Sequence, residues 1–283
     1  LKQRLHNHLI NIVRERDPCF ATGGHFLVRE YIRESLSQWG EVETHEFEVR
    51  NQIYQNLILD LDAATPSNLP PILIGAHYDA VPGTPGADDN ATGVAVLLEL
   101  AAVFKAQPLK YPVRLVAFDL DEAALTGGGL LGSTAYAADM KDQKQTLRLM
   151  LSLEMLGYRD SIPNSQNYPD LIKPFYRDRG DFIALVGNLS AIFDLIRLSR
   201  HISKHGIPCQ ILPDPTNGKL IPITGFSDHS PFWEQGYKAI MVTDTAMLRN
   251  PNYHKPSDTL ESLDLDFLTG VCESLIAALK KVT

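Results

Sequence analysis

The stretch PILIGAHYDAVPGTPGADDNATGVAVLLELAAVF (residues 71–104) decides the fold. It begins with a short apolar run, typical of a buried strand in an α/β sheet, which ends at His77 and Asp79. A loop rich in glycine and proline follows and carries Asp89, and residues 94–104 then have the composition of a buried helix. Strand, loop and helix in this order predict one unit of a largely parallel sheet.

Two further apolar runs also end in acidic side chains. Residues 113–120 lead into Asp121 and Glu122, and residues 147–153 lead into Glu154. Because the carboxyl ends of parallel strands open onto the crevice where α/β sheets bind ligands, these side chains should meet there. One strand that ends in an acid is ordinary, whereas three such strands predict an assembled metal site.

The candidate ligands supply nitrogen and oxygen donors and no thiolate, a set that suits catalytic zinc and, less specifically, manganese or cobalt. Three carboxylates against two divalent cations leave a formal charge of about +1, which a bound hydroxide would neutralise. This charge count favours two ions, bridged by Asp89 in the middle of its loop. The candidate ligands are His77, Asp89, Glu122, Glu154 and His254.

Two more acidic residues have predicted roles beside the metals. Asp121 directly precedes Glu122, so its carboxylate can face the reacting water and act as the general base. Asp79 lies two residues after His77, where it can hydrogen-bond the second ring nitrogen and fix its tautomer. Each motif alone has a simpler explanation as a turn, a helix cap or surface charge. Their joint placement at successive strand ends supports the metal hypothesis.

No repeat, low-complexity tract or linker divides the chain, which indicates one domain over residues 1–283. Helical periodicity predicts N-terminal helices within residues 1–38, ahead of the catalytic motifs in residues 72–260. The elements expected from periodicity are helices over 1–16, 24–38, 130–138, 189–205 and 263–282, strands over 41–49, 52–61, 182–186 and 238–243, and irregular segments over 155–179 and 206–225.

Composition is that of an ordinary globular protein, with 44% apolar residues, 21% charged residues and a net charge of −8. This charge predicts no nucleic-acid partner, and no apolar stretch is long enough to cross a membrane. The 3 cysteines are widely spaced and predict neither a disulfide framework nor a thiolate zinc site. The first residues do not form a signal peptide, which favours the cytoplasm, but the chain lacks an initiator Met. A trimmed leader and export therefore stay open.

Five motifs together resemble the co-catalytic zinc exopeptidase family, which contains aminopeptidase Y-type and bacterial leucyl-type aminopeptidases and the related glutaminyl cyclases. The resemblance spans about residues 54–282 and implies a single α/β domain with a mixed, mostly parallel central sheet between helices, of the zinc exopeptidase or phosphorylase/hydrolase-like type. The motifs are HYDAVPGTPGADDNATG (77–93), VAFDLDEAALTGGGLLGS (116–133), SLEMLGY (152–158), FSDHSPFW (226–233) and YHKPSDT (253–259).

The resemblance also implies a role for each matching residue. One zinc would be bound by His77, Asp89 and Glu154, and the other by Asp89, Glu122 and His254. Asp121 falls where the family has its general base, and Asp79 where it has the acid that supports the first histidine. A cis peptide is expected between Asp89 and Asn90. The residues expected to contact substrate are Asp228, His229 and Tyr253.

Two departures from the family pattern concern the residues around the predicted base. The base position usually holds Glu, and Asp121 is one methylene shorter, although the reference pKa values differ by only ~0.4. Reach is the larger concern, because a displacement of ~1 Å can cost about a hundredfold in rate. Extra glycines at residues 127–129 lengthen the segment before Ser133 and are expected to reshape the rim of the pocket.

These features lead to the hypothesis of a dinuclear zinc aminopeptidase that acts on small peptides with a free N-terminus through a metal-bridging hydroxide. The alternatives are a glutaminyl cyclase with one zinc, a non-catalytic binding module on the same scaffold, and a carboxypeptidase or dipeptidase. Asn90 and the compact segment 122–133 favour the peptidase. The pocket walls are expected in residues 155–179 and 206–225, whose lack of periodicity leaves the side-chain preference of the substrate open.

Overall fold

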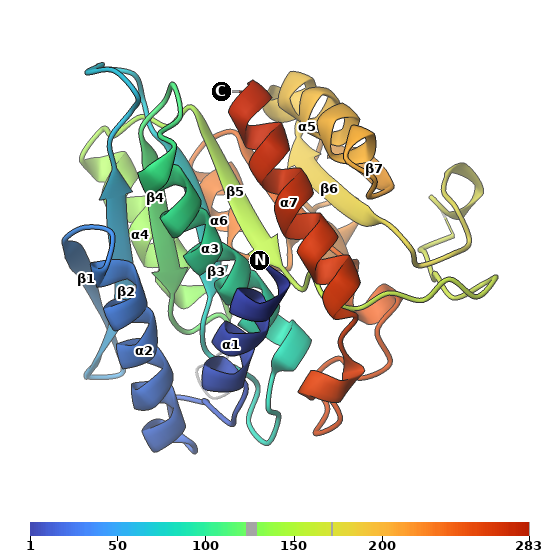
Figure 1. Cartoon of the computed structure of the whole chain (residues 1–283), viewed down its shortest axis with the longest axis horizontal. Coiled ribbons are helices and arrows are strands. Elements are labelled where there is room, and N and C mark those ends of the chain that lie inside the picture. Colours follow the sequence, from blue (N-terminus) through green and yellow to red (C-terminus); the bar gives the residue numbers. More distant parts are fainter. Residues whose placement is uncertain (123–128, 171, 283) are drawn as a thin grey trace.

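The computed structural model describes residues 1–122, 129–170 and 172–282. A single sheet runs through the molecule, with helices on both of its faces (Figure 1). The strands are β1 Val42–Val49, β2 Gln52–Leu61, β3 Ile72–His77, β4 Val113–Phe118, β5 Leu149–Glu154, β6 Ile183–Asn188, β7 Cys209–Asp214 and β8 Ala239–Thr243. The α-helices are α1 Lys2–Ile12, α2 Thr22–Ser37, α3 Gly93–Ala106, α4 Leu131–Asp142, α5 Ile192–Lys204, α6 His229–Glu234 and α7 Leu265–Val282.

The sheet is mixed and has 8 strands in the order β1-β2-β4-β3-β5-β8-β6-β7. The central strands β4, β3, β5 and β8 are parallel to one another, as are β6 and β7. The pairs β1–β2, β2–β4 and β6–β8 are antiparallel. This architecture confirms the α/β fold, with a mixed sheet between helices, that the sequence motifs imply. It also brings the carboxyl ends of β4, β3 and β5 side by side.

The two faces of the sheet are covered by different helices because successive strand residues point to opposite sides. In β3, Ile72 and Ile74 join the apolar cluster to which α1, α2, α3, α5 and α7 contribute, whereas Leu73 joins the cluster of α4 and α6. All residues of β3 are buried, which explains its continuous apolar run up to His77. The strand that carries the first predicted ligand is thus held from both sides.

Two expectations about local structure need correction. The helix expected over 1–16 ends at Ile12, because the following segment turns inward and Arg16 is completely buried. The segment 206–225, expected to be irregular, contains strand β7. Among the described strands, this edge strand pairs with β6 alone, and it is half-buried and contains Pro213, so it shows no alternation of apolar and polar residues.

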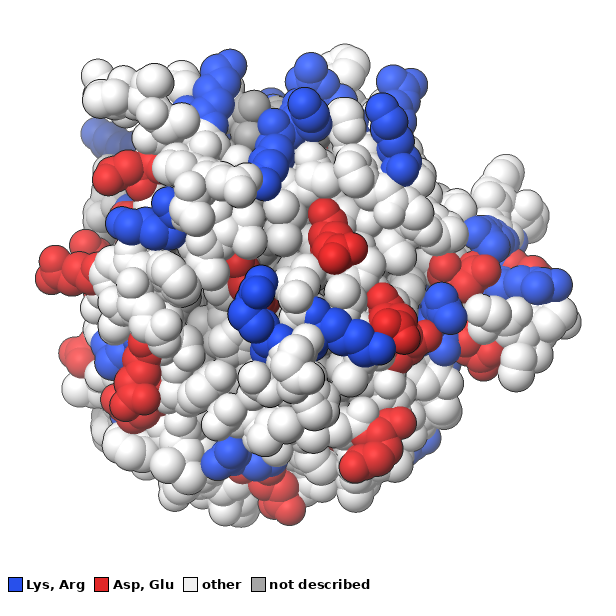
Figure 2. All heavy atoms as spheres, viewed as in Figure 1, with Lys and Arg blue, Asp and Glu red and all other residues white. Residues whose placement is uncertain are grey.

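On the face of the molecule seen in Figure 2, basic side chains gather along the upper edge, and basic and acidic side chains are interspersed over the rest. Within the described residues, no helix combines the length and apolar character that a membrane span requires.

Candidate metal centre and adjoining cavity

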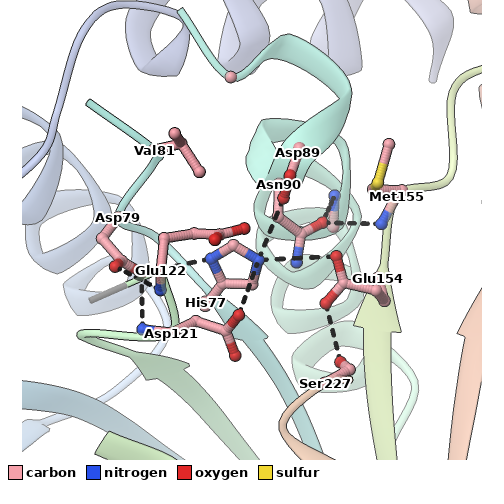
Figure 3. A network of polar contacts seen from close by, with 12 residues as sticks. His77, Asp79, Val81, Asp89, Asn90, Asp121, Glu122, Glu154, Met155 and Ser227 are labelled. Atoms are coloured by element: carbon pink, nitrogen blue, oxygen red, sulfur yellow. Dashed lines mark hydrogen bonds and ion pairs between the residues drawn. The ribbon is translucent and has the colours of Figure 1, made fainter. Parts of the chain in front are cut away.

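The predicted ligands come together at the carboxyl ends of three neighbouring strands. His77 ends β3 in the middle, Glu154 ends β5 on one side, and Asp121 and Glu122 follow β4 on the other. Asp89 projects toward them from the helical turn that precedes α3 (Figure 3). Adjacent parallel strands therefore produce the convergence that the sequence predicts.

Asp89 lies between two histidines and presents a different oxygen to each. Its Oδ1 is 3.4 Å from Nε2 of His77, and its Oδ2 is 3.1 Å from Nε2 of His254. Oε1 of Glu154 lies 3.6 Å from the first of these nitrogens, and Oε1 of Glu122 lies 3.0 Å from the second. Asp89 thus lies between His77 with Glu154 and His254 with Glu122, and His77, Asp89 and Glu122 can place one atom each within 4.8 Å of one another.

The unpaired atoms of this arrangement fit bound cations. Nε2 of His77 and Oδ1 of Asp89 are buried and have no hydrogen-bond partner among the described residues. Zinc bonds of about 2.0–2.2 Å in a tetrahedron place neighbouring ligand atoms roughly 3.3–3.6 Å apart. The separations around His77 fall at this spacing and are too long for good hydrogen bonds. These nitrogen and oxygen donors therefore suit zinc, and none of the five residues supplies a thiolate.

A second grouping includes Asp121. Its Oδ2 lies 3.8 Å from Nε2 of His77, and Asp121, His77 and Glu154 can place one atom each within 4.8 Å of one another. This separation from His77 is longer than those of Asp89 and Glu154, and Oδ1 of Asp121 is buried without a partner. Asp121 thus lies beside the centre, farther from His77 than Asp89 and Glu154 are.

Asp79 connects the ends of β3 and β4. Its Oδ1 lies 3.3 Å from Nδ1 of His77, the distance expected for a weak hydrogen bond to the ring. The same carboxylate accepts the backbone N–H groups of Asp121, at 3.0 Å, and Glu122, at 2.9 Å. One buried side chain therefore orients the histidine and also fixes the backbone that presents the two acids (Figure 3).

Sequence reasoning missed a group that orients Glu154. Oγ of Ser227 donates a 2.8 Å hydrogen bond to Oε2 of Glu154 and is itself 2.7 Å from Oγ of Ser152. This contact leaves Oε1 of Glu154 directed toward His77. In the sequence, Ser227 is indicated only by its place in the FSDHSPFW motif.

The turn that carries Asp89 is fixed by backbone and side-chain bonds. Asp258 accepts the N–H groups of Asp88 and Asp89 at 2.9 and 3.1 Å, and the Asn90 amide donates to the carbonyl of Leu153 at 2.7 Å. The peptide between Asp89 and Asn90 is cis, as the resemblance implies. These contacts join the turn to β5 and to the loop after His254.

Comparison with known proteins also points to a family whose name fits this geometry. Residues 56–279 match peptidase family M28. The chain belongs to that family. The uncharacterized protein YfbL of Escherichia coli (strain K12) is 38% identical to this M28 chain over 260 residues, which cover 88% of this chain and 78% of that protein.

Solved structures with the M28 fold include a peptidase and a cyclase. BSAP, a zinc aminopeptidase from Bacillus subtilis, superposes with a TM-score of 0.60 at 27% identity, over 82% of this chain and 51% of that one. This chain therefore spans about half the length of that aminopeptidase. The glutaminyl cyclase of Tannerella forsythia superposes with a TM-score of 0.74 at 17% identity, over 99% of this chain and 98% of that one, which shows a shared fold.

An apolar cavity of about 310 Å³ opens beside the metal centre of this M28 peptidase. Asp121, Glu122 and Glu154 line one part of it. Other parts of its wall come from the two segments expected to form it, and these lining residues are Tyr168, Ile172, Tyr176, Gln210, Ile211, Leu212, Ile223 and Thr224. The remaining lining residues include Phe182, Ala184, Val186, Met241, Thr243, Met247 and Leu248.

Two adjacent strands supply side chains to this cavity at alternating positions. Phe182, Ala184 and Val186 come from β6 and the residue before it, and their neighbours Ile183 and Leu185 point into the core on the other face. On β8, Thr243 pairs with Ala184 and Met241 pairs with Val186. A rigid antiparallel pair therefore forms part of the cavity wall, which sequence reasoning missed.

The three predicted substrate contacts lie in different surroundings. Tyr253 lines the cavity and its ring stacks on His254 at 3.7 Å. Asp228 is buried, and burial raises its pKa to about 7, although Ser133 opposes this change. His229 is also buried, and Nε2 lies 2.8 Å from the carbonyl of Thr224. Of the three, only Tyr253 is among the described residues that line the cavity.

The glycine-rich segment 127–129 lies largely outside the described residues. Gly127 and Gly128 are not described, whereas Gly129 lines the cavity beside Leu130.

The carboxylates of the site raise the pKa of both histidines. Burial disfavours a charged His77, but the carboxylates of Asp121 and Glu154 outweigh burial and hold its pKa well above the usual value. Burial also opposes charge on His254, whereas its bonds to Asp89 and Glu122 raise its pKa to about 10. For Glu122, burial and the charge of Asp89 raise the pKa to about 7.

Zinc affinity is therefore expected to rise with pH between 6 and 8. A metal binds only the neutral imidazole, so zinc must displace the protons of His77 and His254, and apparent affinity should gain up to about tenfold per pH unit for each proton released. Competition titration against a chelator at three pH values measures the apparent zinc affinity. Calorimetry in two buffers of different ionisation enthalpy measures the number of protons released. Affinity that stays constant across this range, or binding without proton release, would contradict the expectation.

Proposed function

We propose that the chain is a zinc-dependent aminopeptidase with two zinc ions at one centre. The observation that supports this proposal is the position of Asp89, whose two oxygens face Nε2 of His77 and Nε2 of His254 at 3.4 and 3.1 Å. A carboxylate between two histidine nitrogens would allow one side chain to hold both ions of a paired site. A single-zinc centre, as in the cyclase alternative, would leave one of these groups unused.

Each ion has a proposed set of ligands. His77, Asp89 and Glu154 would hold one, and Asp89, Glu122 and His254 the other. When bound, such a pair supplies a water of lowered pKa as nucleophile and polarises the carbonyl to be attacked.

The proposed work of the protein groups is to move a proton and to hold the substrate. Asp121 lines the cavity beside the centre, where it would accept the proton of the attacking water and deliver it to the leaving amine. Glu122 and Glu154 also line the cavity and would bind the free amino group of the peptide by charge. Tyr253, which also lines the cavity, would contact the reacting carbonyl group.

The cavity suits an apolar side chain at the N-terminal residue of the substrate. Apart from the three acids at the centre, its wall contains mainly aliphatic and aromatic residues such as Phe182, Val186 and Met241. Burying a Leu or Phe side chain there would contribute about 1.5–3 kcal/mol, whereas a charged side chain would lose its hydration without gaining a partner.

Turnover on a panel of amino-acid anilides and short peptides, with and without a chelator and added zinc, tests this proposal. The expected result is hydrolysis of Leu, Met and Phe anilides, its loss in chelator, and its recovery with two zinc ions per chain. Cyclisation of peptides with N-terminal Gln, with one zinc per chain, would establish the cyclase instead. Zinc binding without turnover of any substrate would indicate a binding module.

Ala184→Leu is expected to change the substrate preference by filling the cavity from β6. Each methylene that a hydrophobic pocket gains or loses changes discrimination about 10- to 200-fold, so kcat/KM for Leu and Phe anilides should fall by at least about tenfold. The Ala anilide should change by less than about threefold, because its methyl group does not reach this wall. Ala137→Leu, in the cluster between α4 and the sheet, controls for a general packing defect. Equal losses on all three anilides would disprove the assignment of the cavity.

A further inference from the structure

Arg16 is completely buried behind the turn that carries Asp89, and it bonds only to backbone carbonyl groups within the part of the chain that the structure describes. Nε donates to the carbonyl of Tyr78 at 2.7 Å, Nη1 to that of Pro85 at 2.6 Å and Nη2 to that of Gly86 at 2.9 Å. A longer contact of 3.3 Å joins Nη2 to the carbonyl of Asp89 itself.

A buried guanidinium without a carboxylate partner is costly, because it loses its hydration. Burial accordingly lowers the pKa of Arg16 to about 10, although the nearby charges of Asp89 and Asp79 oppose this change. The planar fork compensates by placing its N–H groups on several carbonyls at once, which a lysine ammonium cannot do. Core packing alone does not explain why a charged side chain is buried at this position.

The fork connects the two ends of the loop that supplies Asp79 and Asp89. Tyr78 directly follows the end of β3, next to Asp79, whereas Pro85 and Gly86 precede the turn with Asp89. Gly86 has a φ of +59°, and a Cβ there would lie 2.8 Å from Nη1 of Arg16 and 2.5 Å from the carbonyl oxygen of Asp89. The loop is therefore closed tightly around the guanidinium.

We propose that Arg16 is a positioning residue of the metal centre, whose fork fixes the separation of Asp79 and Asp89 and so sets the affinity for zinc. This inference rests on the proposed metal binding by His77, Asp89 and their partners. It assigns a role in the centre to the N-terminal segment, which lies outside the family match over 56–279. Arg16 acts through the loop and has no direct contact with substrate in this assignment.

The test compares zinc affinity in Arg16→Met, Arg16→Lys and Arg249→Met with that of the unaltered chain. Arg249 is a control for the loss of a buried arginine, because it is also buried but donates to the carbonyl of Phe182 and to Oε1 of Gln166, both at 2.9 Å, and not to the loop between Tyr78 and Asp89. Both Arg16 variants should bind zinc about 10- to 100-fold more weakly, as expected when a group that orients ligands is lost. Arg249→Met should change zinc affinity by less than about threefold.

Affinity is measured by competition with a chelator, and the melting temperature of the chelator-treated protein is recorded for each variant. A purely structural role would lower this melting temperature and leave zinc affinity unchanged, which would overturn the proposal. Full affinity in Arg16→Lys would also overturn it, because charge alone would then suffice. If Arg16→Met does not fold, Arg16→Lys decides by the same criterion. Failure of the unaltered chain to bind zinc would refute the proposed function, on which this inference depends.

Discussion

Asp121→Asn is expected to lower kcat by about 10²- to 10⁴-fold, the usual contribution of a general base, with two zinc ions still bound. The amide has nearly the shape of the carboxylate but cannot accept the proton. Asp121 lines the cavity and its Oδ1 is buried without a partner, so a local change of charge should not disturb other bonds. Turnover of the Leu anilide and zinc content per chain are the two measurements.

Asp121→Glu provides the matched control, because it restores the residue that the family usually has at this position. It should keep turnover within about tenfold of the unaltered chain, since the two acids differ little in reference pKa and only reach changes. Normal turnover in Asp121→Asn would refute the assignment as base. Loss of one zinc would instead identify Asp121 as a ligand, in line with its position near His77 and Glu154.

Asp89→Asn is expected to have the largest effect on metal content, because the proposed bridge loses one of its two ligand oxygens. Both zinc sites should weaken together, and kcat/KM should fall by at least about 10³-fold, since metal activation supplies several kcal/mol. Zinc stoichiometry at fixed free zinc, measured by elemental analysis, gives the result directly.

Two further variants, His77→Ala and His254→Ala, test whether Asp89 holds both ions. Each histidine faces only one oxygen of Asp89, so each variant should lose one zinc and retain the other. Asp60→Asn, at the partly exposed partner of Arg114, should leave both ions bound. Loss of a single ion in Asp89→Asn, with the same phenotype as one histidine variant, would show that Asp89 does not bridge.

Much of the fold follows from short-range patterns in the sequence. The runs that end at His77 and Glu154 have continuous apolar character because both faces of β3 and β5 are buried, and this pattern is visible without a structure. Strand β7 could not be predicted in the same way, because an edge strand with a proline lacks alternation. Its presence depends on pairing with β6, which is a long-range contact.

The candidate ligands could be predicted because each follows a recognisable strand or motif, and the sheet order then brings them together. The residues that orient them were harder to find. Ser227 donates to one oxygen of Glu154, and Asp258 accepts backbone N–H groups of the turn with Asp89. Both contacts join residues that are far apart in the sequence. Arg16 has no sequence signal at all, since its partners are carbonyl groups, which every residue has.

The five proposed ligands are spread over three strand ends, a turn before α3 and a loop that precedes α7. The set His77, Asp89 and Glu154 is complete in sequence by residue 154, whereas the set Asp89, Glu122 and His254 needs the chain as far as residue 254. A nascent chain would therefore lack the second set until its C-terminal part has packed against the sheet. Filling of the second site would be a late step of maturation, and the ratio of zinc to protein in a preparation would report how many molecules have completed it.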